Sequence, residues 1–201
     1  PMFANGMLDD ARRDAETNVS ELSDLVAADY DVICSCTSCS LSLRQEYPEL
    51  FSLDGVDEVS THTFEAIEYL RIYEDLRGEL AEAELPDGID ADLDELAYHA
   101  PCHARNQGLD GQAVELLAEL DGVTVEDVGE SCSGISGTYG WKAEKYEKSM
   151  AIGEEMFEEM ETAAGETGLT ECPTCAMQME HGTGYEVEHP LRVLEAALVA
   201  E

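Results

Sequence analysis

The stretch TECPTCAMQMEHGTG (residues 170–184) carries two cysteines, Cys172 and Cys175, with two residues between them. This spacing places both sulfurs on one short turn, which suits a metal ion or cluster as well as a redox-active dithiol. By itself the motif is ambiguous, because zinc knuckles and thiol–disulfide enzymes share it. It becomes informative because the same motif occurs at Cys36 and Cys39, 136 positions earlier.

The surroundings of the two motifs repeat as well. In residues 5–70 and 139–198, a long amphipathic helix and a short strand precede the cysteines, and a short helix, a valine–histidine step and a final helix follow them. Self-similarity of this kind indicates two copies of one supersecondary unit. We therefore expect an incomplete first cysteine-rich domain at residues 1–88, with its front half missing, and a second cysteine-rich domain at residues 89–201. On this interpretation the chain is a C-terminal fragment.

Hydrophobic periodicity predicts helices alternating with short strands. Helices are expected at residues 8–28, 40–47, 64–80, 113–120, 141–164 and 190–200, and strands at residues 30–34, 96–99 and 123–128. We expect Pro48 to end the second helix, Trp141 to pack against the long helix, and the acidic stretch 82–94 to link the domains. The pattern predicts an α/β fold of two related units. Each is a small parallel sheet flanked by helices, with the cysteine loops at the C-terminal edge of the strands.

The net charge of the chain limits the classes of partner that it can bind. Its 201 residues include 46 acidic and 10 basic side chains, which gives a formal net charge of −36. Self-repulsion of this size is screened in concentrated salt, so the composition indicates a protein of a high-salt cytoplasm. No basic stripe is present to neutralise phosphates, which excludes direct binding of DNA or RNA. No apolar run reaches the roughly 18 residues that a membrane span needs.

The chain has seven cysteines, an odd number that fits thiols in a reducing cytosol better than a disulfide framework. Cys102 and Cys132 each follow an expected strand, as the pair at Cys172 and Cys175 does. Since parallel strands end at one edge of a sheet, these four thiols are expected to converge there. Thiolates are soft ligands, so the site suits an iron–sulfur cluster or zinc.

Several stretches resemble the cysteine-rich, Cys-Cys-Gly domain family found in the B-subunit of heterodisulfide reductase and in related iron–sulfur proteins. They are HAPCH (residues 99–103), SGISGTYG (133–140), ECPTC (171–175), HGTG (181–184) with His189-Pro190, and Ser38-Cys39 with QEYP (45–48). The resemblance covers nearly the whole chain.

The resemblance implies two tandem cysteine-rich domains, placed after a ferredoxin-like domain that this chain lacks. It implies a non-catalytic, iron–sulfur electron-transfer subunit of a flavin-linked dehydrogenase complex in anaerobic respiration. The partners would be flavoprotein dehydrogenase subunits and the membrane quinone pool, with the chain in the cytoplasm or peripheral at the cytoplasmic face of the membrane. Carried over by position, the ligands of a [4Fe–4S] cluster would be Cys102, Cys132, Cys172 and Cys175, while Cys36 and Cys39 would be the surviving half of the ligand set for a further cluster.

The sequence departs from the family at Cys132-Ser133, where relatives with a non-cubane cluster have two adjacent cysteines. Four cysteines still suffice for an ordinary [4Fe–4S] cluster, and we expect Ser133 to serve the loop. Three alternatives stay open: a heterodisulfide-reductase-like or lactate/glycolate oxidase iron–sulfur subunit, a zinc-stabilised interaction module, and a thiol–disulfide enzyme with Cys172 or Cys36 as nucleophile.

For the other candidate side chains, the sequence supports only less specific predictions. Cys34 is expected to be a buried strand residue with no ligand role. Four histidines could orient a ligand or tune a potential, but equally could be turn or capping residues: His62, His103, His181 and His189.

Overall fold

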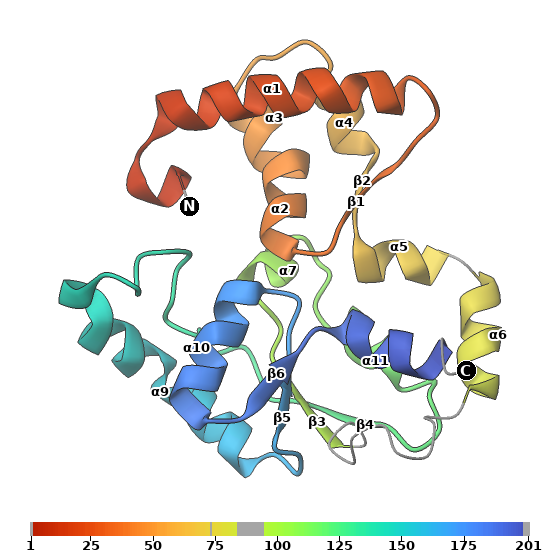
Figure 1. Cartoon of the computed structure of the whole chain (residues 1–201), viewed down its shortest axis with the longest axis vertical. Helices are drawn as coiled ribbons and strands as arrows, with labels where there is room; N and C mark the ends of the chain where they lie inside the picture. The colour runs from red at the N-terminus through yellow and green to blue at the C-terminus, as the bar shows by residue number, and fades with distance from the viewer. Residues whose placement is uncertain (1, 73, 84–94, 199–201) are drawn as a thin grey trace.

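The computed structural model describes residues 2–72, 74–83 and 95–198 (Figure 1). The first unit contains η1 (Phe3–Asn5), α1 (Leu8–Val26), β1 (Val32–Cys34), α2 (Thr37–Leu41), η2 (Ser42–Glu46), α3 (Tyr47–Leu50), α4 (Val56–Thr61), β2 (Thr63–Glu65), α5 (Ala66–Ile72) and α6 (Glu74–Glu82). The second unit contains β3 (Glu95–Tyr98), α7 (Cys102–Asn106), α8 (Gln112–Leu117), β4 (Thr124–Asp127), η3 (Ala143–Lys145), α9 (Tyr146–Thr162), β5 (Thr167–Leu169), α10 (Pro173–Thr183), β6 (Glu186–Glu188) and α11 (Pro190–Leu198).

All strand pairs of the two sheets are parallel. The first unit has a two-stranded sheet, in which Ile33 of β1 lies opposite Phe64 of β2. The second unit has a four-stranded sheet in the order β4-β3-β5-β6. The prediction of an α/β fold with two small parallel sheets flanked by helices is therefore confirmed.

The long helix α1 covers the first unit, as the upper part of Figure 1 shows. Its residues Ala11, Ala15 and Val19 recur every four positions and are buried, so one stripe of the helix faces the core. They pack with residues of η2 to α4, including Tyr47, Phe51 and Val59. Burial of this stripe fixes α1 against the helical segment that follows Cys36 and Cys39.

The four-stranded sheet of the second unit is covered on both faces. Leu96 and Tyr98 of β3 point to one face, where helices α8 and α11 complete the core. Ala97, between them, points to the other face and packs with Met156 and Met179 of α9 and α10. Side chains of a strand alternate between faces, so a short apolar strand serves both layers. Ile67 of α5 and Leu80 of α6 also pack in the first of these cores.

The sequence repeat has a structural counterpart. β1 pairs with β2 and β5 pairs with β6, and in each copy the cysteine pair starts the helix that follows the first strand. A longer helix precedes each copy, α1 in the first unit and α9 in the second. The two units are thus related in topology as well as in sequence.

Some expected elements are wrong in their bounds. The helix expected at residues 64–80 is interrupted, because Thr63 to Glu65 form β2 and the helical part is split into α5 and α6. In this segment, pairing with β1 determines the secondary structure in spite of the helical periodicity of the sequence. Pro48 does not end a helix but lies in the first turn of α3, where its missing N–H costs nothing.

The long helix of the second unit begins later than expected. Residues 141–142 belong to a loop, and α9 starts at Tyr146 after a single 3₁₀ turn. Trp141 is 52% exposed instead of being packed in the core. Most of the expected linker, residues 84–94, lies outside the described residues, and the proposed domain boundary at residues 88–89 stays a prediction.

Candidate iron–sulfur site

The cysteines of the second unit follow the C-terminal ends of neighbouring strands. Cys102 begins α7 after β3, Cys132 lies in the loop after β4, and Cys172 and Cys175 lie at the start of α10 after β5. Since β4, β3 and β5 are adjacent and parallel, their ends bring these loops to one edge of the sheet. The convergence that the sequence predicts is thus present in the strand order.

Cys172 and Cys175 form the buried part of this site. Cys172 is the N-cap of α10, and its sulfur accepts a hydrogen bond from the backbone N–H of Cys175 at 3.4 Å. Hydrogen bonding from the Cys175 thiol lowers the pKa of Cys172 to about 6, and the same bond raises the pKa of Cys175. The two thiols pack among Ala97, Met156 and other apolar side chains. A thiolate is thus stabilised at Cys172 by donors of its own turn.

The loop that carries Cys132 is fixed by glycine and serine. Gly134 has φ +81°, and its N–H donates to the sulfur of Cys132 at 3.4 Å. A Cβ at Gly134 would lie 2.1 Å from the carbonyl oxygen of Ser149, so only glycine fits this turn. Ser149 Oγ donates to the Gly134 carbonyl at 2.9 Å and ties the loop to α9.

Ser133 points into the same site. It is 3% exposed, and its hydroxyl donates to the sulfur of Cys175 at 3.4 Å. The residue that follows Cys132 therefore contacts one of the four candidate ligands directly. The sequence alone indicated a loop role, and the contact with Cys175 could not be read from it.

Cys102 completes the group from the surface side. Partial burial, followed by the negative charges of Cys132 and Cys172, raises the pKa of Cys102. The negative charges of Cys172 and Cys102 likewise contribute to raising the pKa of Cys175. These mutual electrostatic effects link all four cysteines in one neighbourhood. Among the side chains that the structure describes, no three from histidine, cysteine, aspartate and glutamate form a group suited to a single metal ion.

The first pair, Cys36 and Cys39, has the same local geometry on α2. Cys36 is the N-cap, and hydrogen bonding from the Cys39 thiol lowers the pKa of Cys36 to about 5. The charge of Cys36 acts on Cys172. The structure therefore places the first pair beside the second unit's site, an adjacency that sequence reasoning missed.

Hydrogen bonds between the units hold this arrangement. His103 Nδ1 lies 2.8 Å from Ser38 Oγ, and Gln107 Nε2 donates to the Thr37 carbonyl at 3.0 Å. His189 Nε2 donates to the Ser35 carbonyl at 2.8 Å. Two of the histidines singled out in the sequence thus bind the loop around the first cysteine pair. Thr37 Oγ1 is buried without a hydrogen-bond partner.

The remaining candidates have other surroundings. Cys34 is half-buried in β1, and burial, with the nearby charges of Cys36 and Glu65, raises its pKa to about 11. His62 contacts Asp31, and His181 contacts Tyr146.

A buried acid lies directly behind Cys172. Both carboxylate oxygens of Glu171 accept a hydrogen bond from the Tyr98 hydroxyl, at 2.9 and 3.1 Å. Burial raises the pKa of Glu171 to about 8 and lowers the pKa of the neighbouring His99 to about 4. This cluster was not foreseen from the sequence, although a glutamate between an apolar strand and a cysteine motif was a signal that could have indicated it.

Comparison with known proteins agrees with the geometry. Residues 96–180, which contain all four cysteines of the second unit's site, match the family model described as a cysteine-rich domain. This segment is thus similar to the cysteine-rich domain family, and the resemblance drawn from the sequence motifs is confirmed.

Over almost its whole length, the chain is also similar to one particular protein. It is 34% identical over 203 aligned residues, 98% of the chain, to the C-subunit of anaerobic glycerol-3-phosphate dehydrogenase from Escherichia coli strain K12. The values are the same for the corresponding protein of Escherichia coli O157:H7. The alignment covers 48% of each of these proteins, so the chain spans about half the length of the curated relatives it matches.

None of the helices within the described residues is long and apolar enough to cross a membrane.

Proposed function

We propose that the chain is the iron–sulfur electron-transfer part of a flavin-linked dehydrogenase complex, with a role like that of the C-subunit of anaerobic glycerol-3-phosphate dehydrogenase. In this role it accepts electrons from a catalytic flavoprotein and passes them toward the membrane quinone pool. The partners are flavoprotein dehydrogenase subunits, and the site of action is the cytoplasmic face of the membrane.

The observation that carries the proposal is the convergence of four cysteines at one sheet edge, within the segment that matches the cysteine-rich domain. We propose Cys102, Cys132, Cys172 and Cys175 as the ligands of a [4Fe–4S] cluster. When bound, such a cluster supplies reversible one-electron chemistry, and its potential depends on hydrogen bonds to sulfur and on solvent exposure.

The residues present fit a cluster of this kind. Cys172 and Cys175 are buried among apolar side chains, which excludes water from one side of the site. Backbone N–H groups of Cys175 and Gly134 and the hydroxyl of Ser133 donate to the sulfurs. These donors hold the thiolates in place and stabilise their negative charge. Cys36 and Cys39 are proposed as half of a second ligand set.

Anaerobic reconstitution of the chain with iron and sulfide tests the function. We expect brown protein with about four irons per chain, as four thiolates imply, and an EPR signal after reduction. Cys102→Ala and Cys132→Ala should lose most of the bound iron. The matched control Cys34→Ala should keep it, because Cys34 belongs to neither proposed ligand set.

Two results would contradict the proposal. Colourless protein that carries stoichiometric zinc and shows no redox activity would establish a structural zinc module instead. Equal iron content in Cys102→Ala, Cys132→Ala and Cys34→Ala would mean that the ligand set is wrong.

A further inference from the structure

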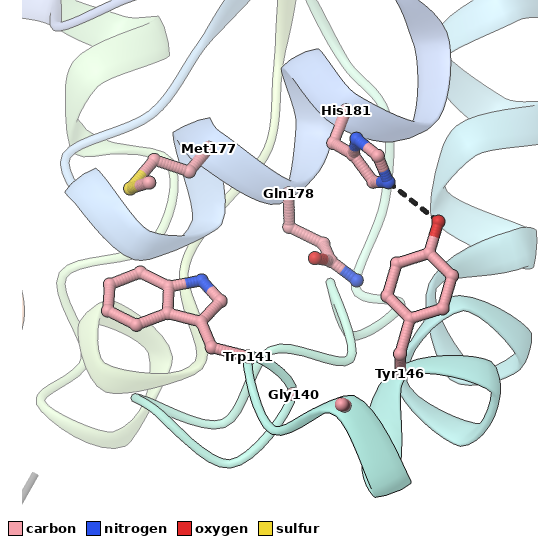
Figure 2. Close-up of a pocket in the computed structure, with 7 residues that line it drawn as sticks. Gly140, Trp141, Tyr146, Met177, Gln178 and His181 are labelled. Atoms are coloured by element: carbon pink, nitrogen blue, oxygen red, sulfur yellow. Dashed lines mark hydrogen bonds between the residues drawn. The ribbon is translucent and has the colours of Figure 1, made fainter.

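An open cavity of about 520 Å³ lies beside the candidate iron–sulfur site (Figure 2). It is bounded by the loop before α9, the start of α9 and one side of α10. The lining residues are Gly140, Trp141, Ala143, Tyr146, Met177, Gln178 and His181. The proposed electron-transfer role uses none of these side chains. We call this cavity the aromatic pocket.

One end of the aromatic pocket is apolar. Figure 2 shows the thioether of Met177 above the indole ring of Trp141, with the two side chains coming from different elements. Each is 52% exposed, so both side chains are accessible to a ligand. A flat ring that packs against the indole and the thioether gains dispersion and sulfur–aromatic contacts.

The other end offers hydrogen-bonding groups. The hydroxyl of Tyr146 and Nε2 of His181 lie 2.7 Å apart. When Nε2–H of His181 is the donor, the hydroxyl proton of Tyr146 is free to bind a ligand. Gln178 Nε2 donates to Ser149 Oγ at 3.1 Å, which fixes the amide between Trp141 and Tyr146, as Figure 2 shows. A ligand with a carbonyl oxygen at one edge would therefore find a donor at this end.

The charges of the lining select an uncharged ligand. None of the seven lining residues is an acid, a lysine or an arginine. An anion would meet no cation in the aromatic pocket and would be repelled by a chain of net charge −36. An organic cation would find no carboxylate among the lining residues to pair with. Concave, mostly apolar sites with a few fixed polar groups are typical of small-molecule binding.

The aromatic pocket and the cysteine site share helix α10. Cys175 precedes Gln178 by three residues, a rise of about 4.5 Å along the helix axis. Ser149, which holds Gln178, also donates to the carbonyl of Gly134, next to Ser133 and its contact with Cys175. A ligand in the aromatic pocket is therefore separated from the cysteine site by little more than one helical turn.

We infer that the aromatic pocket binds the head group of a quinone, an uncharged planar ring with carbonyl oxygens at its edge. The ring packs against Trp141 and Met177, and one carbonyl oxygen accepts a hydrogen bond from the Tyr146–His181 pair. This assignment rests on the proposed function, because only an electron carrier beside the pocket gives a quinone a reason to bind there.

The test uses Trp141, the single tryptophan of the chain, whose indole N–H gives one resolved signal in a ¹H–¹⁵N spectrum. The purified 201-residue chain is titrated with 2,3-dimethyl-1,4-naphthoquinone, whose substituted ring offers cysteine thiolates no free position for addition, and, separately, with 2,3-dimethylnaphthalene, which has the same ring but no carbonyl oxygen. We expect a saturable shift of the indole signal with the quinone and roughly three- to ten-fold weaker binding of the hydrocarbon, as loss of a hydrogen bond implies.

Variants locate the binding. Met177→Ala and His181→Ala should each weaken naphthoquinone binding roughly three- to ten-fold. Tyr30→Phe is the control for a conservative change at an exposed tyrosine outside the aromatic pocket, and it should bind as the parent does. Circular dichroism of each variant checks that the fold is kept.

The inference is overturned if the indole shift rises linearly without saturation, or if the variants bind as tightly as the parent. A saturable shift with tetramethylammonium and none with naphthoquinone would also overturn it, in favour of a cation site. Iron binding is measured separately. A chain that binds iron but no naphthoquinone refutes the aromatic pocket alone, whereas a colourless chain refutes the proposed function.

Discussion

At the level of single residues, Ser133 is a side chain outside the four cysteines that contacts one of the candidate ligands. Its hydroxyl donates to the sulfur of Cys175. A donor to sulfur stabilises the more negative state of the site, so it favours electron uptake. We therefore predict that Ser133 tunes the potential of the candidate site.

Ser133→Ala should therefore lower the reduction potential of the reconstituted site by tens of millivolts, on the order expected for one neutral hydrogen bond. An EPR-monitored redox titration measures the change. Ser131→Ala is the control, because Ser131 contacts Glu159 and leaves the Cys175 sulfur untouched. An unchanged or raised potential in Ser133→Ala would show that the hydroxyl does not act on the site.

The cysteines illustrate what sequence could and could not predict at this scale. The positions of Cys102, Cys132, Cys172 and Cys175 after strands were enough to place them at one sheet edge. The buried pair Tyr98–Glu171 was not foreseen, because a long-range hydrogen bond depends on two strand ends that only the folded sheet brings together.

At the level of elements, the boundary between β2 and α5 shows why a periodic pattern was insufficient. Glu65 ends β2, and its carboxylate accepts hydrogen bonds from the N–H groups of Ile67 and Glu68, at 2.7 and 3.2 Å. It thereby caps α5. Helical periodicity extends across this boundary in the sequence, but the strand pairing of Thr63 to Glu65 is a long-range contact that periodicity does not encode.

Glu65 also makes stability depend on pH. Burial, partly offset by these N–H donors, raises its pKa from 4.5 to about 7. Between these values the folded state holds a proton that the unfolded state has released, so the free energy of unfolding falls as pH rises through this window. Glu65→Gln, which cannot ionise, should reduce the fall by on the order of 1–3 kcal/mol.

Urea unfolding between pH 5 and pH 8, with salt held high, measures this slope for the parent and the variant. Part of the slope should remain in Glu65→Gln, because the pKa of Glu171, raised to about 8 by burial, has an effect of the same sign. Glu49→Gln, at an exposed acid of α3, is the control for the loss of one surface charge. Identical slopes for parent and Glu65→Gln would refute the assignment.

At the level of the whole molecule, the two units meet through their cysteine loops. Residues of α7 and the loop after β6 bind the loop of Cys36 and Cys39, and α5 and α6 pack on the core of the second unit. The repeat in the sequence predicted two copies and their internal topology. It could not predict how they pack, because contacts between copies are not part of what is repeated.

The net charge of −36 should make the stability of this assembly depend on salt. The Debye length falls from about 10 Å at 0.1 M to about 3 Å at 1 M, so repulsion between distant surface acids is screened. We expect the urea midpoint to rise steeply with KCl across this range. Sucrose at equal osmolality is the control, because it does not screen charges. A urea midpoint that does not change with KCl would contradict the prediction.

The two-stranded sheet has a consequence for self-association. Within the described residues β1 is hydrogen-bonded to β2 alone, so its other edge is open, and Ile33 in it is 51% exposed. An open edge invites a strand from an identical molecule. At low ionic strength, two copies that each carry a charge of −36 repel one another before the edges can meet. In concentrated salt that repulsion is screened. β1 is only three residues long, which is too short to template a lasting intermolecular sheet. Under these conditions the short length of the strand is what protects the protein from aggregation through this edge.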